Sequence, residues 1–147
     1  MKIIEKVPKI TGHLHYVATR RGDIVEVFDD HNLVVDAGRE LMALIMTGKQ
    51  TTSITKIGVG TGITPEAVKD TGLTDCVYIP LTARSTDGKT ARFDFVIGTD
   101  QANGLNIHEF GLFAENGTMF SHRVRAKEKD LVKADDLELT GYWEINF

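Results

Sequence analysis

The chain has 147 residues, the length of one domain that can bury a substantial core. Apolar residues make up 41% and charged residues 26%, the balance of an ordinary soluble globular protein. Lys and Arg number 17 against 21 Asp and Glu, so the formal net charge of −4 argues against a nucleic-acid-binding surface.

The start of the chain, MKIIEKVPKI, contains only short apolar runs interrupted by charge. It therefore predicts neither a signal peptide nor a membrane span. The longest apolar run, LMALIM at 41–46, is too short to cross a bilayer, so we expect no membrane insertion. The single cysteine, Cys76, excludes an internal disulfide and fits folding in a reducing cytosol.

Residues 13–19 and 23–29 predict a first β-hairpin, closed by a turn at Arg20–Asp23. The turn contains the tripeptide Arg-Gly-Asp, which matches an integrin-binding signature, but a glycine turn explains it without a receptor. His13 and His15 share one face of the predicted strand. They could bind a metal only with a third ligand from elsewhere, and no cysteine or histidine follows at ligand spacing. We predict no metal site here.

The next element is a predicted helix over residues 37–47, with Asp36 as its N-cap and Gly48 as its stop. Leu41, Leu44 and Ile45 fall on one face, and two methionines fill much of the rest. Such an apolar helix is expected to be largely buried against a sheet.

The stretch ITKIGVGTG (54–62) predicts a strand that ends in alternating glycines. Its G-x-G-x-G spacing matches neither the Walker loop nor the dinucleotide fingerprint, and Ile63-Thr64-Pro65 follows it. We therefore predict no nucleotide cofactor and interpret the glycines as tight backbone turning.

A second hairpin is predicted within residues 77–97, where a three-residue loop at Thr86–Gly88 keeps the apolar sides in register. That register places Leu81 opposite Phe93 and Ile79 opposite Phe95. It also requires Gly88 in the left-handed region of backbone conformation.

A third hairpin surrounds Asn116-Gly117, the dipeptide favoured in a two-residue type I′ turn. This turn would pair Glu115 with Thr118, Phe113 with Phe120, Gly111 with His122 and Phe110 with Arg123. Strand alternation turns His108 and Glu109 to opposite faces, so they cannot bind one metal ion together. Glu109 and His122 become diagonal neighbours on one face, which predicts a structural hydrogen bond. The basic residues of 123–129 are interpreted as a solvated turn.

Residues 137–147, LELTGYWEINF, alternate strictly between apolar and polar, which predicts a half-buried antiparallel strand running to Phe147. The elements together predict a single domain over 1–147. Its fold class is mainly β, an antiparallel β-sandwich with one buried α-helix at about 37–47.

The sequence predicts no catalytic, cofactor-binding or metal-binding residues. Ser53, Ser85 and Ser121 lie in no nucleophile-elbow context, and Cys76 has no neighbouring histidine. The chain is therefore expected not to be an enzyme.

Several blocks nevertheless resemble a family of small tail-associated structural proteins of tailed bacteriophages. The matching blocks are the helix start Asn32-Leu33-Val34 with Ala37-Gly38, the segment KIGVGTGITPEAVKDTGLT, the hairpin IHEFGLFAENGTMFSHRV and the closing LELTGYWEINF. The hairpin is also similar to one in amino-terminal domains of phage tail fibres. The charged loop AKEKDLVKADD departs from the Ser/Thr-rich connection that the family leads us to expect.

The resemblance implies a structural component of a phage or prophage virion, without catalytic residues and without a cofactor. Its expected partners are other tail or baseplate proteins and further copies of itself, as a trimer or a hexamer. Two other functions stay open, a receptor- or carbohydrate-binding β-sandwich module and a capsid decoration protein.

Overall fold

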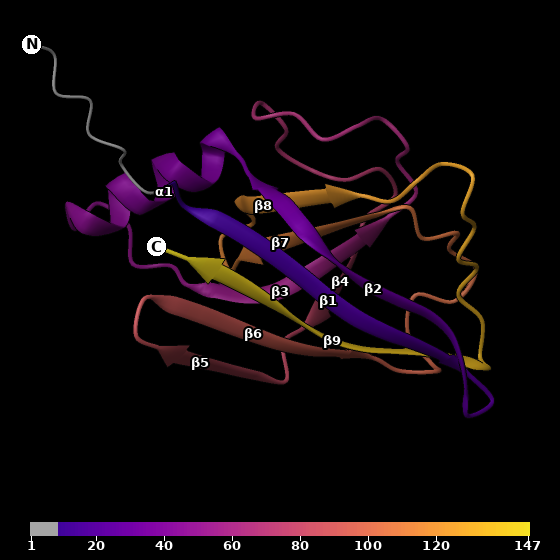
Figure 1. Ribbon diagram of the computed structural model, residues 1–147. Coiled ribbons are helices and arrows are strands. Elements are labelled where there is room, and N and C mark those ends of the chain that lie inside the picture. The colour runs from indigo at the N-terminus through magenta and orange to yellow at the C-terminus, as the bar shows by residue number, and fades with distance from the viewer. Residues whose placement is uncertain (1–8) are drawn as a thin grey trace, which may run out of the picture.

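Nine strands form one continuous sheet in the computed structural model, which describes residues 9–147 (Figure 1). The prediction about the start of the chain therefore falls mostly outside the described residues. In chain order the elements are β1 (Thr11–Arg20), β2 (Asp23–Val34), α1 (Asp36–Met46), β3 (Ile54–Gly60), β4 (Val77–Pro80), β5 (Ala83–Asp87), β6 (Thr90–Ile97), β7 (Glu109–Ala114), β8 (Met119–Val124) and β9 (Leu137–Asn146).

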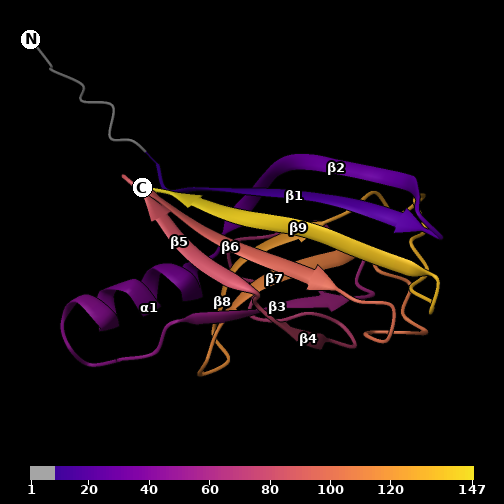
Figure 2. The same ribbon diagram turned by 90° about the horizontal axis from the view of Figure 1, so that it is seen from below.

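The sheet is antiparallel and has the strand order β4-β3-β7-β8-β2-β1-β9-β6-β5. β2 joins its two halves, because it pairs with β1 along most of its length and with β8 through Leu33 and Val34. The prediction of a mainly antiparallel β protein is confirmed. The strands curl into a half-barrel (Figure 2) instead of separating into two stacked sheets.

The core lies inside this curl, and both halves of the sheet contribute to it. Tyr16 of β1, Trp143 of β9 and Phe95 of β6 belong to the same buried cluster as Ile57 of β3 and Phe110 of β7. Because this cluster spans both halves of the sheet, the two halves stabilise each other through apolar burial.

β9 follows the predicted alternation, with buried and more exposed residues in turn from Leu137 to Ile145. It lies between β1 and β6, so the strand is central to the sheet. The predicted extension to the end of the chain is wrong by one residue, because β9 ends at Asn146 and the Phe147 side chain is about half exposed.

The first hairpin is confirmed as β1–β2, and its turn has positive φ at Arg21 (52°) and Gly22 (84°). Positive φ at both central residues is the type I′ geometry, which matches the twist of the flanking strands. Arg21 is tolerated there although it carries a side chain.

The predicted register of the second hairpin is wrong. Phe93 pairs with Arg84 and not with Leu81, and the loop is the two residues Gly88-Lys89 between paired Asp87 and Thr90. Ile79 lies in a separate strand, β4, where it pairs with Ile57. The chain therefore leaves the apolar register after Pro80, and β5 is exposed along its whole length. The positive φ expected at Gly88 is confirmed (56°).

The β7–β8 hairpin keeps the predicted pairs Gly111–His122 and Phe110–Arg123. Nearer the turn a β-bulge shifts the register, so Phe113 pairs with Met119 instead of Phe120. The predicted two-residue type I′ turn is wrong, because the Ala114 N–H bonds to the Thr118 carbonyl and only Gly117 has positive φ (93°). A three-residue loop with a glycine at its third position replaces it.

Helix α1 begins and ends almost where the sequence predicts, but two expectations about it are wrong. The N-cap is Val35 and not Asp36, and no side chain caps the helix. Only Gly38 and Leu41 are buried in the helix, whereas Leu44 and Ile45 are each 41% exposed and Met46 is 81% exposed. The helix projects from one end of the sheet and packs mainly on β8 (Figure 2). Within residues 9–147 no helix has the length and apolar character needed to span a membrane.

Candidate functional site

A long connection between β3 and β4, residues 61–76, lies across the outer face of β3, β7 and β8. We call it the strap. One backbone hydrogen bond closes the strap on itself, and another joins it to α1. Thr61 N–H donates to the Thr74 carbonyl at 3.0 Å, and Asp36 N–H, at the start of α1, donates to the Val68 carbonyl at 2.8 Å. The face below the strap is therefore covered, and every residue of β7 is buried.

The glycines of β3 allow the strap to pack directly against the strand. A Cβ atom on Gly58 would lie 2.9 Å from Cys76 Sγ, and one on Gly60 would lie 2.6 Å from the Thr74 carbonyl oxygen. Both glycines belong to the extended strand, and neither has positive φ. The interpretation of this stretch as tight turning is therefore wrong, because the glycines make room for a chain segment that packs directly on the sheet.

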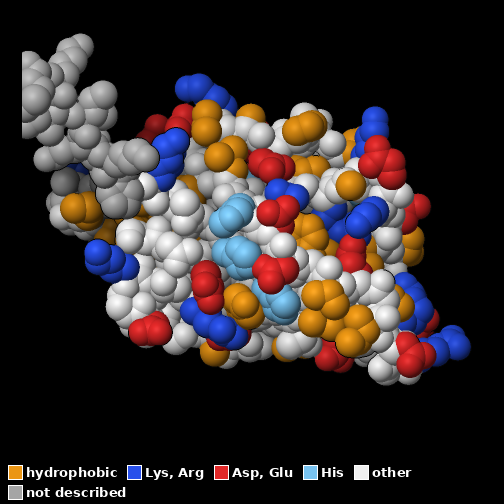
Figure 3. Space-filling model, in the orientation of Figure 1, with side chains coloured by type: hydrophobic (Ala, Val, Ile, Leu, Met, Phe, Trp, Pro, Cys, Tyr) orange, Lys and Arg blue, Asp and Glu red, His pale blue; other side chains and the backbone are white. Residues whose placement is uncertain are grey.

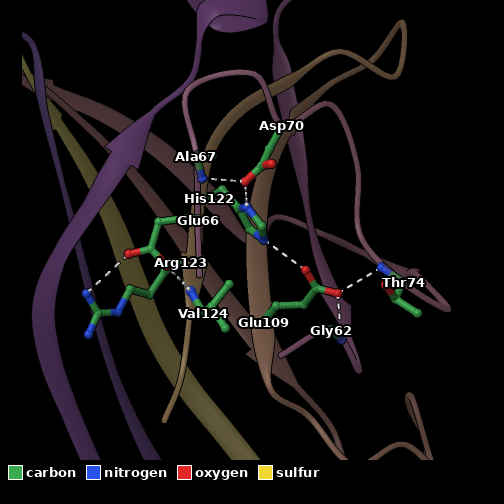
Figure 4. A network of polar contacts seen from close by, with 9 residues as sticks. All are labelled: Gly62, Glu66, Ala67, Asp70, Thr74, Glu109, His122, Arg123 and Val124. Carbon is green, nitrogen blue, oxygen red and sulfur yellow. Dashed lines mark hydrogen bonds and ion pairs between the residues drawn. The ribbon is translucent and has the colours of Figure 1, made fainter. Parts of the chain in front are cut away.

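A chain of three ionisable side chains, two of them buried, fastens the strap to the sheet (Figure 4). His122 of β8 lies between Asp70 of the strap and Glu109 of β7. Its Nδ1 is 2.8 Å from Asp70 Oδ2, and its Nε2 is 2.8 Å from Glu109 Oε1. The Glu109–His122 contact that the sequence predicts is confirmed. Asp70 was not predicted, because it lies 52 residues before His122 in a loop without a recognisable pattern.

The second oxygen of Glu109 also holds the strap. Glu109 Oε2 accepts hydrogen bonds from the backbone N–H groups of Gly62 and Thr74, each at 2.8 Å. Burial alone would raise the pKa of Glu109, but the bonds from His122 and from these two amides outweigh burial, so the pKa is lowered. The carboxylate is thus kept ionised beneath the strap.

The pKa of His122 is shifted in the opposite direction. Burial alone would lower the pKa of the imidazole, but its hydrogen bonds to Glu109 and Asp70 outweigh burial and raise the pKa. The chain Asp70–His122–Glu109 is therefore an ion network that joins a loop to a sheet. No serine or cysteine of residues 9–147 hydrogen-bonds to a histidine, so the network has no adjoining nucleophile.

A cleft of about 680 Å³ opens at one edge of the strap, between residues 63–66 and residues 123–127. Glu66 is one of the residues that line it. One carboxylate oxygen accepts the Val124 N–H at 3.0 Å, and the other lies 3.7 Å from Arg123 Nη1. Lys127 is exposed at the rim. The cleft combines apolar walls with basic groups.

Arg125 corrects the interpretation of residues 123–129 as a solvated turn, since it is only 4% exposed. Its guanidinium donates to Glu26 Oε1 at 2.5 Å, to the Tyr16 hydroxyl at 2.9 Å and to the carbonyls of Ile107 and Lys129. The Tyr16 hydroxyl in turn donates to Glu26 Oε2 at 2.7 Å. Burial and the neighbouring Glu26 raise the pKa of Tyr16 despite the opposing charge of Arg125.

His13 and His15 lie together on the outer face of β1, where histidine side chains gather in the space-filling view (Figure 3). Asp29 of β2 contacts both, by a short hydrogen bond to His13 Nε2 and at 3.6 Å from His15 Nδ1. His31 stands edge-on to His13, with ring centroids 5.6 Å apart. No group of three or more potential ligands in the described residues has the arrangement of a metal site.

The other side chains considered from the sequence lie apart from one another. Ser53 and Ser85 are exposed, and Ser121 is fully buried with no hydrogen-bond partner for its hydroxyl. Cys76, the last residue of the strap, packs beside Phe113. His108 turns away from Glu109, as predicted, and its Nε2 lies 3.6 Å from Asp130.

No protein-family description, no curated protein and no solved structure matches this chain.

Proposed function

We propose that this protein is a non-enzymatic structural subunit of a bacteriophage or prophage virion, located in the tail, the baseplate or the fibre-attachment region. The proposal starts from the resemblance of its sequence blocks to tail-associated proteins. The structural observation that supports it is the presence of two groups of exposed apolar side chains at opposite ends of the molecule.

One apolar patch is on α1. Leu44, Ile45 and Met46 follow one another at the end of the helix and are 41%, 41% and 81% exposed. The second patch is on β2, next to the turn of the first hairpin, where Ile24 and Val27 are 66% and 58% exposed. Figures 1 and 2 place α1 and this turn at opposite ends of the sheet. Large apolar side chains that gather on a surface are typical of contacts with other proteins.

Two separate patches suit a subunit that contacts a neighbour at each end. When one surface of a subunit binds a different surface of the next copy, the contact is head-to-tail and repeats along the assembly. Such an assembly closes into a ring if the rotation between successive copies is a whole fraction of a full turn. We therefore propose a cyclic homo-oligomer, first a trimer by analogy with tail fibres and second a hexameric ring. Other tail or baseplate proteins would cover the surfaces that the ring leaves open.

The decisive experiment examines the parent particle. Mass spectrometry of purified virions is expected to find this chain, and cryo-electron microscopy is expected to place it in the tail. A position on the capsid would identify a decoration protein instead. Absence from mature particles, or specific turnover of a substrate by the purified protein, would refute the structural role.

Interface variants test the two patches separately. Met46→Glu and Val27→Glu are expected to block incorporation into particles while leaving the melting temperature within about 2 °C, because each replaces an exposed side chain. Thr51→Glu, at an exposed polar position near α1, is the matched control. Normal incorporation of both patch variants would contradict the proposed contacts.

The cleft beside the strap favours a second candidate, a receptor- or carbohydrate-binding module. A cleft of about 680 Å³ has the size of a small-molecule site, and Lys127 at its rim could bind an acidic sugar. Glycan-array binding that is abolished by Lys127→Ala would support this function, and an empty array would exclude it for the glycans displayed.

A further inference from the structure

The position of His122 determines its protonation state. A neutral imidazole has one N–H donor and one acceptor nitrogen, whereas ionised carboxylates only accept. Both ring nitrogens of His122 lie 2.8 Å from carboxylate oxygens, those of Asp70 and Glu109. A neutral ring could donate to one carboxylate and would direct its lone pair at the other. Only the imidazolium donates to both.

The charges around this ring are few. β7 contributes Glu109, and the strap contributes Asp70. Nearby, Glu66 of the strap and Arg123 of β8 face each other at 3.7 Å, and Asp30 of β2 lies 2.8 Å from Arg123 Nη2. At the start of α1, Asp36 lies 3.8 Å from Lys69 of the strap. On the other side of β7, the strand β3 presents Gly58 and Gly60.

The two ends of the network differ in how firmly they are held. Glu109 is 4% exposed, and backbone amides bind its second oxygen, whereas the Asp70 side chain is 30% exposed. A ring that loses its proton therefore keeps its Nε2–H bond to Glu109 and turns a lone pair toward Asp70. We therefore expect the strap to separate from His122 at Asp70, while Glu109 stays bound.

Asp70 also organises the adjacent part of the strap. The same Oδ2 atom accepts the Ala67 N–H at 2.7 Å, and the Asp70 N–H donates to the Ala67 carbonyl at 3.0 Å. Val68, between them, accepts the Asp36 N–H in the first turn of α1 at 2.8 Å. Movement of Asp70 would therefore disturb the backbone contact that seats α1.

We propose that residues 66–70 are a proton-operated latch, closed while His122 is an imidazolium and released when His122 loses its proton. The latch would couple pH to the seating of α1, the helix that carries the exposed apolar patch. The raised pKa of His122 agrees with this geometry. Since the folded-state pKa is raised, the stabilisation is complete below the ordinary histidine value and is lost as pH rises through the folded pKa.

Amide hydrogen exchange of the full chain, measured by NMR between pH 5.5 and 9.5, tests the latch. The protection factors of the Ala67 and Asp36 amides are expected to fall by about tenfold per pH unit above about pH 6.5, and to level off above the pKa of the latched ring. The Gly62 and Thr74 amides, which Glu109 holds, are expected to keep their protection. Imidazole ¹⁵N shifts should report a doubly protonated His122 at pH 6.

Three variants separate the latch from general loosening. His122→Gln cannot titrate, so the exchange profile should become flat. Asp70→Asn should flatten it too, because a carboxamide can accept from the protonated ring or donate to the neutral one. His13→Gln, at a histidine paired with a different aspartate, should leave the profile unchanged.

A flat profile in the natural protein overturns the proposal, and so does a neutral His122 ring at pH 6. A fall that persists in His122→Gln also overturns it. If His122→Gln does not fold, Asp70→Asn decides the question alone, because the pH-dependent fall must disappear in that variant.

Discussion

Gly141 should be one of the positions at which the fold least tolerates an added methyl group. It lies in the middle of β9, paired with Tyr16 of β1 on one side and with Phe95 of β6 on the other. A Cβ atom there would lie 2.2 Å from the His15 carbonyl oxygen, 2.7 Å from Tyr16 Cβ and 2.9 Å from the Phe95 ring. Real Cβ contacts almost never fall below 3.0 Å, so the backbones of β9 and β1 must separate.

The cost follows from what has to move. Extra methylene groups in a packed core typically cost about 1–3 kcal/mol, and occasionally more. The nearest atom here is a backbone oxygen within the sheet, which cannot relax by a side-chain rotation. We therefore expect Gly141→Ala to lower the free energy of unfolding by about 3 kcal/mol or more. That is a large part of the roughly 5–15 kcal/mol that stabilises a domain.

Gly72→Ala is the matched control. Gly72 lies in the exposed strap, has ordinary φ, and has no atom within 4 Å of an added Cβ. Alanine at this position reduces only the conformational freedom of the unfolded chain. The free energy of unfolding is therefore expected to rise by about 0.4–1 kcal/mol. The same substitution should thus have opposite effects at the two sites.

Urea unfolding followed by the fluorescence of Trp143 measures both variants. This residue is the only tryptophan of the chain and is fully buried, so its emission reports loss of the core. At the melting temperature, 3 kcal/mol corresponds to a decrease of about 6–12 °C for a domain of this size. A loss below about 1 kcal/mol in Gly141→Ala, or equal effects of the two alanines, would refute the packing argument.

Three further predictions concern charge and turns. Arg125→Met should lower the free energy of unfolding by about 3–5 kcal/mol, because it leaves the partly buried carboxylate of Glu26 without its cation. Arg21→Met, at an exposed position, should change it by no more than about 0.5 kcal/mol. Similar urea midpoints for the two variants would contradict the role of Arg125. The lowered pKa of Glu109 gives stability that is lost as pH falls from about 4.3 through that pKa. In Glu109→Gln the free energy of unfolding should therefore depend less on pH in this range than in the natural protein. Parallel acid-unfolding curves for the two proteins would contradict this prediction. Gly22→Val and Gly88→Val should each lower the free energy of unfolding by about 1–3 kcal/mol, since both glycines have positive φ and open surroundings. A lower melting temperature in only one of the two variants would show that φ is not the cause.

Local patterns predicted the parts of the fold that depend on neighbours in sequence. The alternation of β9 could be predicted because one face is buried and the other is not. The Glu109–His122 bond was predicted by counting pairs back from a two-residue turn. The loop is one residue longer than that, but the extra residue of the β-bulge in β8 compensates for it, so the pairs beyond the bulge keep the predicted register. Strand periodicity carries this information because side chains alternate every residue.

The remainder depends on contacts between distant segments. Arg125 meets Tyr16 across 109 residues of sequence, and a basic run gives no sign of which arginine will be buried. The apolar end of α1 predicted burial, but burial also requires a surface to cover it, and β8 covers only the first part of the helix. The glycines of β3 marked a special backbone without indicating that a strap would lie on them.

The central place of β9 has a consequence for the order of synthesis. A ribosome makes β1 and β6 long before the strand that joins them, so the nascent chain carries two open sheet edges inside its future core. Pairing over such a sequence separation is slow, and unpaired edges associate with other chains. β1 can pair with β2 early, but its pairing with β9 must wait until residues 137–146 have left the ribosome. Chaperones that shield nascent chains would protect this protein during that interval, and ribosomal stalling ahead of residue 137 would release an aggregation-prone fragment.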